Sequence, residues 1–300
     1  MPVSTLLCWC VDQTYLTLIL LDLPYPNDET KTLLTEQQFE DFLKTAKENE
    51  YNWNNYYQDY KMGEQTVQYK GYWDKNRQQI VGLGELKFSD GSVYQGQINN
   101  KNFNGKGRIT RANGDVFQGE YVDGQANGQG VFVDSEGSMY VGQWTNDKQH
   151  GQGVETWNDN GTMRYEGQYV EGSKTGKGKF QYEGSVYEGD FVDGKFHGQG
   201  KYFFSDTGKI YRGQFVENQI QGKGIMIFPD RTIYNGNFVD GKMEGQGTMQ
   251  TPNGDRYIGA FKDDVKEGTG VWFNSQNHTK RQGTWVANKR TAWIGPETQA

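Results

Sequence analysis

A tripeptide made of an aromatic residue, any residue and glycine recurs along this 300-residue chain every 22 to 25 residues. Its aromatic residues are Tyr69, Tyr94, Phe117, Tyr140, Tyr165, Tyr187, Tyr211, Tyr234 and Tyr257, and a degenerate tenth copy begins at Arg281. A fixed period of this length indicates a repeat protein, in which no unit can bury its apolar face alone. The sequence therefore predicts nine similar units across residues 69–280.

A second marker, Gly-x-Gly, follows the first at a nearly constant distance. It begins 11 residues after the aromatic residue in eight copies, from Gly105 to Gly268, and 13 residues after it in the first copy, at Gly82. The stretch from Gly-x-Gly to the next tripeptide takes up most of the variation in length. Because variable length belongs to loops, each unit is predicted to have a tight inner turn and a looser outer turn.

Aromatic residues alternate with polar ones inside each unit. Two positions after the glycine of the tripeptide stand Trp73, Ile98, Tyr121, Trp144, Tyr169, Phe191, Phe215, Phe238, Phe261 and Trp285. This period of two places both aromatic positions and the glycine between them on one face of a strand. A second short strand is predicted after Gly-x-Gly, as at Lys201–Phe204, and pairs such as Asp123–Gly124 and Asn253–Gly254 favour hairpin turns.

The predicted ring-bearing face supplies the candidate binding or structural residues. They are Tyr94, Phe117, Tyr121, Tyr140, Trp144, Tyr165, Tyr169, Tyr187, Phe191, Tyr211, Phe215, Tyr234, Phe238, Tyr257 and Phe261. A glycine inside a strand destabilises it unless another group approaches closely. We therefore expect the bare backbone at the repeated glycines to let neighbouring rings lie flat, so that the rings form one continuous layer.

Together these markers resemble the MORN repeat (membrane occupation and recognition nexus), over about 210 residues. The departures are the longer first copy, Phe117 in place of Tyr, Ile98 in place of an aromatic residue, and Arg281 in the last copy. The resemblance implies an all-β repeat array: an elongated, single-layer, twisted antiparallel β-ribbon curved into a shallow groove. It also implies settings such as cilia, including radial-spoke heads, and the cytoskeleton.

Charge divides the chain into two unequal parts. Residues 1–66 hold 11 acidic and 4 basic side chains, whereas residues 67–300 hold 27 of each, so the whole net charge of −7 lies in the first part. We expect an acidic N-terminal segment at 1–66, the array at 67–290 and a tail at 291–300. A neutral array does not attract nucleic acid, and its charge does not favour anionic lipid.

The N-terminal segment carries an amphipathic pattern. Thr35 is a candidate cap for a helix over about 35–60, and Phe39, Phe42, Leu43, Ala46, Trp53 and Tyr57 follow at helical spacing, with Tyr60 at the end of the stripe. Two interpretations remain open: this helix packs on its own array, or it docks on a partner or on a second copy. The apolar run at 14–23 reads equally well as a strand or as a buried helix.

No constellation of residues predicts catalysis, a cofactor or a metal. Gly-x-Gly recurs between strands and lacks the Lys-Ser/Thr of a phosphate-binding loop. His150 and His197 precede Gly-x-Gly at a place that elsewhere holds Asn, Thr, Gln or Glu, so we interpret them as solvated turn residues. Cys8 and Cys10 are the only cysteines and are interpreted as reduced thiols of a cytoplasmic protein.

The sequence therefore predicts a non-enzymatic scaffold or adaptor rather than an enzyme. Rings dominate the energy of protein interfaces, so a ring-lined groove suits a helix or an extended peptide of a protein partner, or of a homodimer mate. We expect a cytoplasmic location in a cytoskeletal or ciliary assembly. The alternatives are a peripheral phospholipid-binding module and a regulatory subunit of a separate enzyme.

Overall fold

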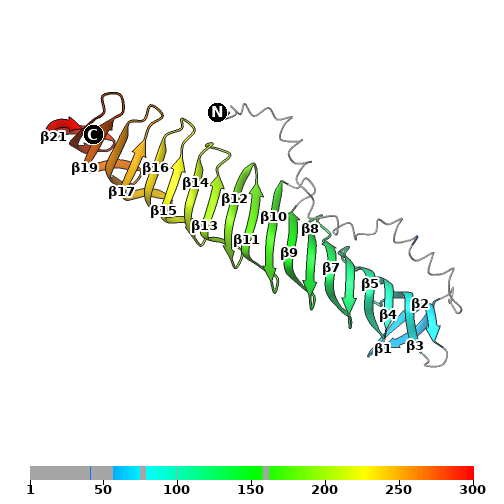
Figure 1. Ribbon diagram of the computed structural model, residues 1–300. Helices are drawn as coiled ribbons and strands as arrows, with labels where there is room; N and C mark the ends of the chain where they lie inside the picture. Colours follow the sequence, from blue (N-terminus) through cyan, green and yellow to red (C-terminus); the bar gives the residue numbers. More distant parts are fainter. Residues whose placement is uncertain (1–40, 42–56, 75–78, 100, 158–161) are drawn as a thin grey trace, which may run out of the picture.

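One antiparallel sheet of 21 strands makes up the architecture of the computed structural model, which describes residues 41, 57–74, 79–99, 101–157 and 162–300. Every strand pairs with the strands that precede and follow it in the chain (Figure 1). The strands are β1 (Gln58–Met62), β2 (Gln65–Asp74), β3 (Gln79–Lys87), β4 (Val93–Asn99), β5 (Asn102–Thr110), β6 (Val116–Val122), β7 (Gln125–Val133), β8 (Met139–Thr145), β9 (Lys148–Trp157), β10 (Met163–Val170), β11 (Ser173–Tyr182), β12 (Ser185–Val192), β13 (Lys195–Phe203), β14 (Ile210–Val216), β15 (Gln219–Ile227), β16 (Ile233–Val239), β17 (Lys242–Gln250), β18 (Arg256–Lys262), β19 (Val265–Asn274), β20 (Thr279–Val286) and β21 (Lys289–Gln299).

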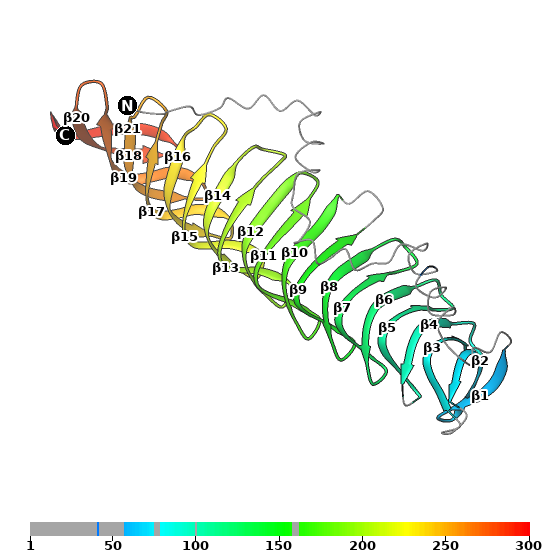
Figure 2. The ribbon, with the colours of Figure 1, turned by 45° about the vertical axis from the view of Figure 1, so that its right-hand side comes forward.

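The described part of the chain is a long, curved and twisted ribbon one sheet thick (Figures 1 and 2). At roughly 4.8 Å between neighbouring strands, 21 strands extend over about 100 Å. Contacts link each hairpin to its sequence neighbours, which is the arrangement expected of a repeat array. The predicted fold class, an elongated single-layer β-ribbon, is confirmed.

Inner turns of two residues join the two strands of most units. Asp123 and Gly124, between β6 and β7, have φ of 49° and 88°, and Glu217 and Asn218, between β14 and β15, have 50° and 72°. Two successive residues with positive φ form the turn whose twist matches that of a hairpin. The connections between units are more varied, as at residues 111–115 and 204–209, so the tight inner turn and looser outer turn match the prediction.

A bulge next to each inner turn explains the first glycine of Gly-x-Gly. Gly105 and Gly128 adopt φ of 81° and 103°, in the region that side chains disfavour, and the strand register shifts beside them. At the bulge, one backbone N–H has no partner in the strand pairing. A side-chain oxygen of the preceding strand accepts a hydrogen bond from it. Gln97 Oε1 accepts from Lys106 N at 2.7 Å, and other units repeat the contact.

The remaining glycines make room for tyrosine rings. The Tyr94 hydroxyl donates to the Gln97 carbonyl at 2.7 Å, so the ring lies along the backbone. A Cβ added at Gly107 would stand 2.3 Å from that hydroxyl oxygen. The same bond recurs at Tyr165 and Tyr211. The expected role of the glycines, a bare backbone against which rings lie, is therefore seen in the structure.

Both ends of the sheet extend beyond the predicted array of 67–290. Residues 58–60 belong to β1, so the predicted helix cannot continue to about 60. Tyr60 is buried and its ring lies edge-on to Trp73 at 5.8 Å, and Gly63 opens the turn into β2. At the other end, the predicted tail at 291–300 contributes most of β21, which pairs with β20. Pairing with β2 and the ring contact with Trp73 favour a strand at Tyr60 over continuation of the helix.

Candidate functional site

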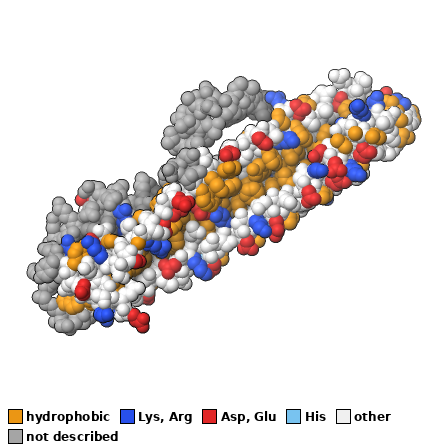
Figure 3. Space-filling view, turned by 180° about the vertical axis from the view of Figure 1, so that it is seen from behind, with side chains coloured by type: hydrophobic (Ala, Val, Ile, Leu, Met, Phe, Trp, Pro, Cys, Tyr) orange, Lys and Arg blue, Asp and Glu red, His pale blue; other side chains and the backbone are white. Residues whose placement is uncertain are grey.

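One face of the sheet, here called the aromatic face, carries the repeated tyrosines. Seen from behind, hydrophobic side chains form a stripe along the ribbon between rims of polar and charged side chains (Figure 3). All 15 predicted aromatic residues belong to this face. Fourteen of them are buried, with exposed fractions of 0–6%, and only Trp144 is half-buried. The buried rings therefore hold the array together.

From Tyr94 to Trp285 the rings contact one another in an unbroken series that includes the half-buried Trp144. Tyr165 lies edge-on to Tyr169 of its own unit at 5.4 Å and to Phe191 of the next unit at 4.9 Å. Tyr187 repeats this with Phe191 at 5.2 Å and Phe215 at 5.0 Å. Edge-to-face pairs at these distances stabilise by roughly 0.5–1.5 kcal/mol beyond the area they bury. From Tyr94 onward, each unit is therefore joined to the next through equivalent rings, whereas Ile98 takes the place of the ring between the first two units.

A second set of side chains covers the buried rings and lines the open surface. These half-buried residues come mostly from the second strand of each unit. They include Phe103, Ile109, Phe132, Trp157, Phe180, Phe196, Tyr202, Phe204, Phe228, Met249, Trp272 and Trp293. The candidate site predicted from the sequence does not include these residues. Alternation after Gly-x-Gly is the signal for those that follow it, such as Phe132 and Phe180, whereas Phe103 and Phe196 precede it.

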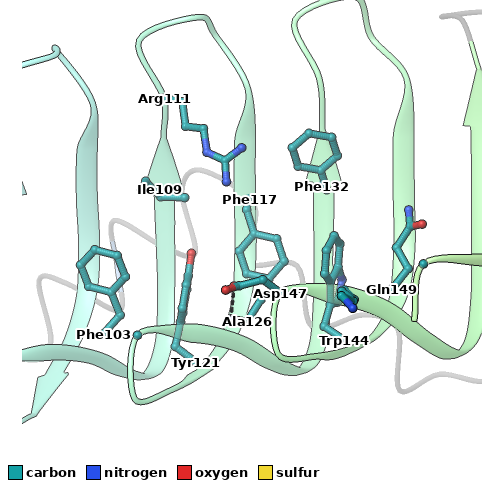
Figure 4. A pocket seen from close by; sticks show the side chains of 13 residues that line it. Phe103, Ile109, Arg111, Phe117, Tyr121, Ala126, Phe132, Trp144, Asp147 and Gln149 are labelled. Atoms are coloured by element: carbon teal, nitrogen blue, oxygen red, sulfur yellow. Dashed lines mark hydrogen bonds between the residues drawn. The ribbon is translucent and has the colours of Figure 1, made fainter. Parts of the chain in front are cut away.

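A hollow of about 630 Å³ lies on the aromatic face over β5–β9. Phe103, Phe117, Tyr121, Phe132 and Trp144 turn their rings toward it (Figure 4). The Asp147 carboxylate beside it accepts the backbone N–H of Ala126 at 2.7 Å, which ties the inner turn to the preceding unit. The hollow is thus apolar at its floor and polar at its rim, as peptide-binding and ligand-binding sites usually are.

Two lysines stand at equivalent places on the aromatic face but differ in their partners. Lys174 Nζ lies 2.6 Å from the Glu155 carboxylate, which also accepts the Tyr169 hydroxyl at 2.9 Å. Lys266 lies over the rings of Tyr257 and Trp272, at 5.4 and 5.5 Å, and forms no ion pair with the described residues. Burial lowers the pKa of Lys266. The place that Glu155 fills beside Lys174 is taken by Met249 beside Lys266.

The opposite face, here called the polar face, has a hollow of about 920 Å³ over β9–β14. Its directly paired strand residues alternate in sign: Glu166 with Lys179, Lys179 with Glu188, and Glu188 with Lys201. Opposite charges across strands stabilise a sheet. This hollow is therefore explained by cross-strand pairing and needs no ligand.

Several predicted residues lie elsewhere. Phe39, Phe42, Leu43, Ala46, Trp53 and the run at 14–23 lie outside the described residues. Tyr57 precedes β1, where its hydroxyl donates to Glu85 and its ring lies 4.1 Å below Lys87 Nζ. The interpretation of His150 and His197 as turn residues is wrong: both are half-buried strand residues beside the bulge, in β9 and β13.

The described residues also include no group of three or more His, Cys, Asp and Glu side chains placed to hold a metal ion. Within the same residues, no helix has the length and apolar character needed to cross a bilayer.

Two solved structures show a weak likeness to this chain. The TCP domain of SAS-4 from Drosophila melanogaster, in complex with a proline-rich motif of Ana2, has 12% identity and a TM-score of 0.34 over 60% of this chain and 90% of that one. A streptogramin B lyase has 10% identity and a TM-score of 0.14 over 83% and 84%. Scores this low carry no argument about function. No curated protein matches the sequence.

Comparison with family models finds the MORN repeat, in eight consecutive copies. They cover residues 94–116, 117–139, 140–162, 165–184, 187–209, 211–233, 234–256 and 257–277, which is more than half of the chain. The predicted copies at Tyr69 and Arg281 lie outside these matches, although β2 and β20 continue the same sheet. The chain therefore belongs to the MORN repeat family.

Proposed function

We propose that this chain is a non-enzymatic scaffold whose aromatic face binds a helix or an extended peptide of a protein partner. Family membership gives the general role, a protein-interaction or membrane-binding scaffold. The observation that carries the proposal is the row of half-buried rings on a face already rigidified by the buried rings beneath it. Preformed aromatic surfaces bind with little loss of conformational freedom, and rings supply most interface energy.

The hollow over β5–β9 is the proposed main contact, and Lys266 is a second one. Because Lys266 lacks a carboxylate that Lys174 has, a partner with an acidic side chain among its apolar ones would complete the pair. The partner that fits best is thus an amphipathic segment with a carboxylate on its apolar side. We place this scaffold in the cytoplasm, in a cytoskeletal or ciliary assembly, for which a long stiff ribbon is suited.

Capture of cross-linked partners from the source cells tests this proposal. We expect the full-length tagged chain to retain partners that are lost with Phe132→Ser, because Phe132 lines the hollow. Removing such a ring from an interface centre weakens binding by about 2 kcal/mol or more.

The matched control is Ile225→Ser, which removes an apolar side chain of 36% exposure from the polar face. Identical partners with both variants would show that the aromatic face is not the binding surface. Sedimentation of the purified chain with acidic vesicles at low salt tests for membrane binding. Vesicle binding that Phe132→Ser abolishes would show that the aromatic face binds a membrane and not a protein partner.

A further inference from the structure

Three valines form an apolar patch on the polar face of β7–β9, at the opposite side of the sheet from the proposed partner site. Val131 pairs directly with Val141, and Val141 pairs directly with Val154. They belong to the row of polar-face residues in which other units place Glu166, Lys179 or Lys201. Three apolar side chains in direct cross-strand pairing form a patch of the kind that another surface can cover.

The two flanking valines are more buried than residues at equivalent places elsewhere in the row. Val131 and Val154 are 6% and 7% exposed, whereas Ile225 and Ile258, at equivalent places in the same row, are 36% and 41% exposed. The direct neighbours do not explain the difference, because Ile225 stays exposed between the longer Arg212 and Asn235. Val141, between them, is half-buried, so the two flanking valines are the enclosed members of the patch.

We propose that the N-terminal segment of the same chain binds the valine patch and stabilises the array on its polar face. The contact would be made by the stripe of Phe39, Phe42, Leu43 and Ala46. This segment is the part of the chain with a predicted amphipathic helix, and it precedes β1 directly. It would occupy the polar face and leave the aromatic face free for a partner. The inference therefore goes beyond the proposed function and does not depend on it.

The length of the connection fits this placement. The distance from β1 to β8 is seven strand spacings, or about 34 Å at roughly 4.8 Å each. Residues 51–57 contain three asparagines that disfavour a helix, and as an extended chain they reach about 23 Å. A helix from 43 to 50 adds about 10 Å. Such a path would bring Leu43 about 33 Å from the start of β1, which is the level of Val141.

Hydrogen exchange of the full-length chain, followed by mass spectrometry, tests the proposal. Amides of residues 36–50 should be protected in the wild type and should exchange at least 10-fold faster in Val141→Glu. Glutamate is native in the same row at Glu166 and Glu188, so this substitution fits the sheet. Leu43→Glu, which leaves the sheet unaltered, should have the same effect.

The matched control is Ile258→Glu, in the same row but away from the patch, and it should leave the protection of residues 36–50 unchanged. Unprotected amides in the wild type, or protection that neither Val141→Glu nor Leu43→Glu lowers, would overturn the proposal. Protection that disappears on dilution, together with a dimer mass in light scattering, would assign the patch to the segment of a second copy and overturn binding within one chain.

Discussion

At the scale of single residues, the array depends on tyrosine rings that pack on backbone left bare by glycines. Each repeated tyrosine donates its hydroxyl to the backbone carbonyl three residues later, and glycines on the two paired strands leave space for the ring. A buried hydroxyl that has its hydrogen bond costs little to bury, and the ring contributes apolar area. This explains how a sheet with only 34% hydrophobic residues in the sequence obtains a core.

Replacement of a buried ring tests which face holds the array together. Phe191 is 2% exposed, and we expect Phe191→Ala to lower the free energy of unfolding by about 3–5 kcal/mol because it leaves a cavity. Val192, the next residue, points to the other face and is 46% exposed, so Val192→Ala should lower it by less than about 1 kcal/mol. Urea unfolding of the two variants measures the difference. Equal losses would contradict the assignment of faces.

At the scale of secondary-structure elements, the inner turns do more than reverse the chain. The Asn218 backbone N–H donates to the Phe196 carbonyl of the preceding unit at 3.0 Å, and its side-chain oxygen accepts the Phe196 N–H at 2.8 Å. Asp264 and Asn288 make the same double contact further along the ribbon. A row of hydrogen bonds thus runs along the edge formed by the inner turns and connects units that are not joined by strand pairing at that point.

Two substitutions at Asn218 separate the side-chain hydrogen bond of this turn from its backbone conformation as contributions to stability. Asn218→Ala removes the side-chain hydrogen bond and places alanine at a φ of 72°, so we expect a loss of about 2–3 kcal/mol in the free energy of unfolding. Asn218→Gly removes only the side-chain hydrogen bond, because glycine accepts positive φ. It should therefore lower the free energy of unfolding by about 1 kcal/mol. Thermal and urea unfolding compare them. A glycine variant as unstable as the alanine variant would show that backbone strain contributes nothing.

At the scale of the whole molecule, the sheet has no second layer in its described part, so the same ring series must stabilise all units. Burial raises the pKa of Tyr165, Tyr211 and Tyr234 to about 12, and it also raises the pKa of Tyr94, Tyr140 and Tyr187. Tyrosines in the unfolded chain ionise near pH 10. The buried phenols therefore favour the folded state only while they remain protonated.

Alkaline unfolding should follow from this shift. The free energy of unfolding should be constant up to about pH 10 and should fall between about pH 10 and 12, because in that range the unfolded chain loses phenol protons that the folded chain retains. Circular dichroism would follow unfolding while phenolate absorbance follows ionisation. The two should change together and cooperatively. Ionisation of all tyrosines near pH 10 in a still folded chain would contradict the burial of the ring series.

Much of this arrangement was decided by the sequence alone. The spacing of Tyr-x-Gly and Gly-x-Gly predicts the hairpins, their faces and the type of inner turn, because period two and positive-φ residues such as Gly124 are local properties. It also predicts that the rings share one layer. Those conclusions need only nearest neighbours along the chain, and a repeat array consists of such contacts.

The tertiary structure decided which rings are buried and which line the open surface. Tyr165 and Phe180 lie on the same face and look equally suitable for binding in the sequence, yet the first is fully buried and the second is half-buried. The difference arises from how successive units overlap, which depends on the sheet's curvature. Packing between neighbouring strands likewise decided that Tyr60 joins a strand, that Lys266 lacks the partner of Lys174, and that Val131 is buried while Ile258 is exposed.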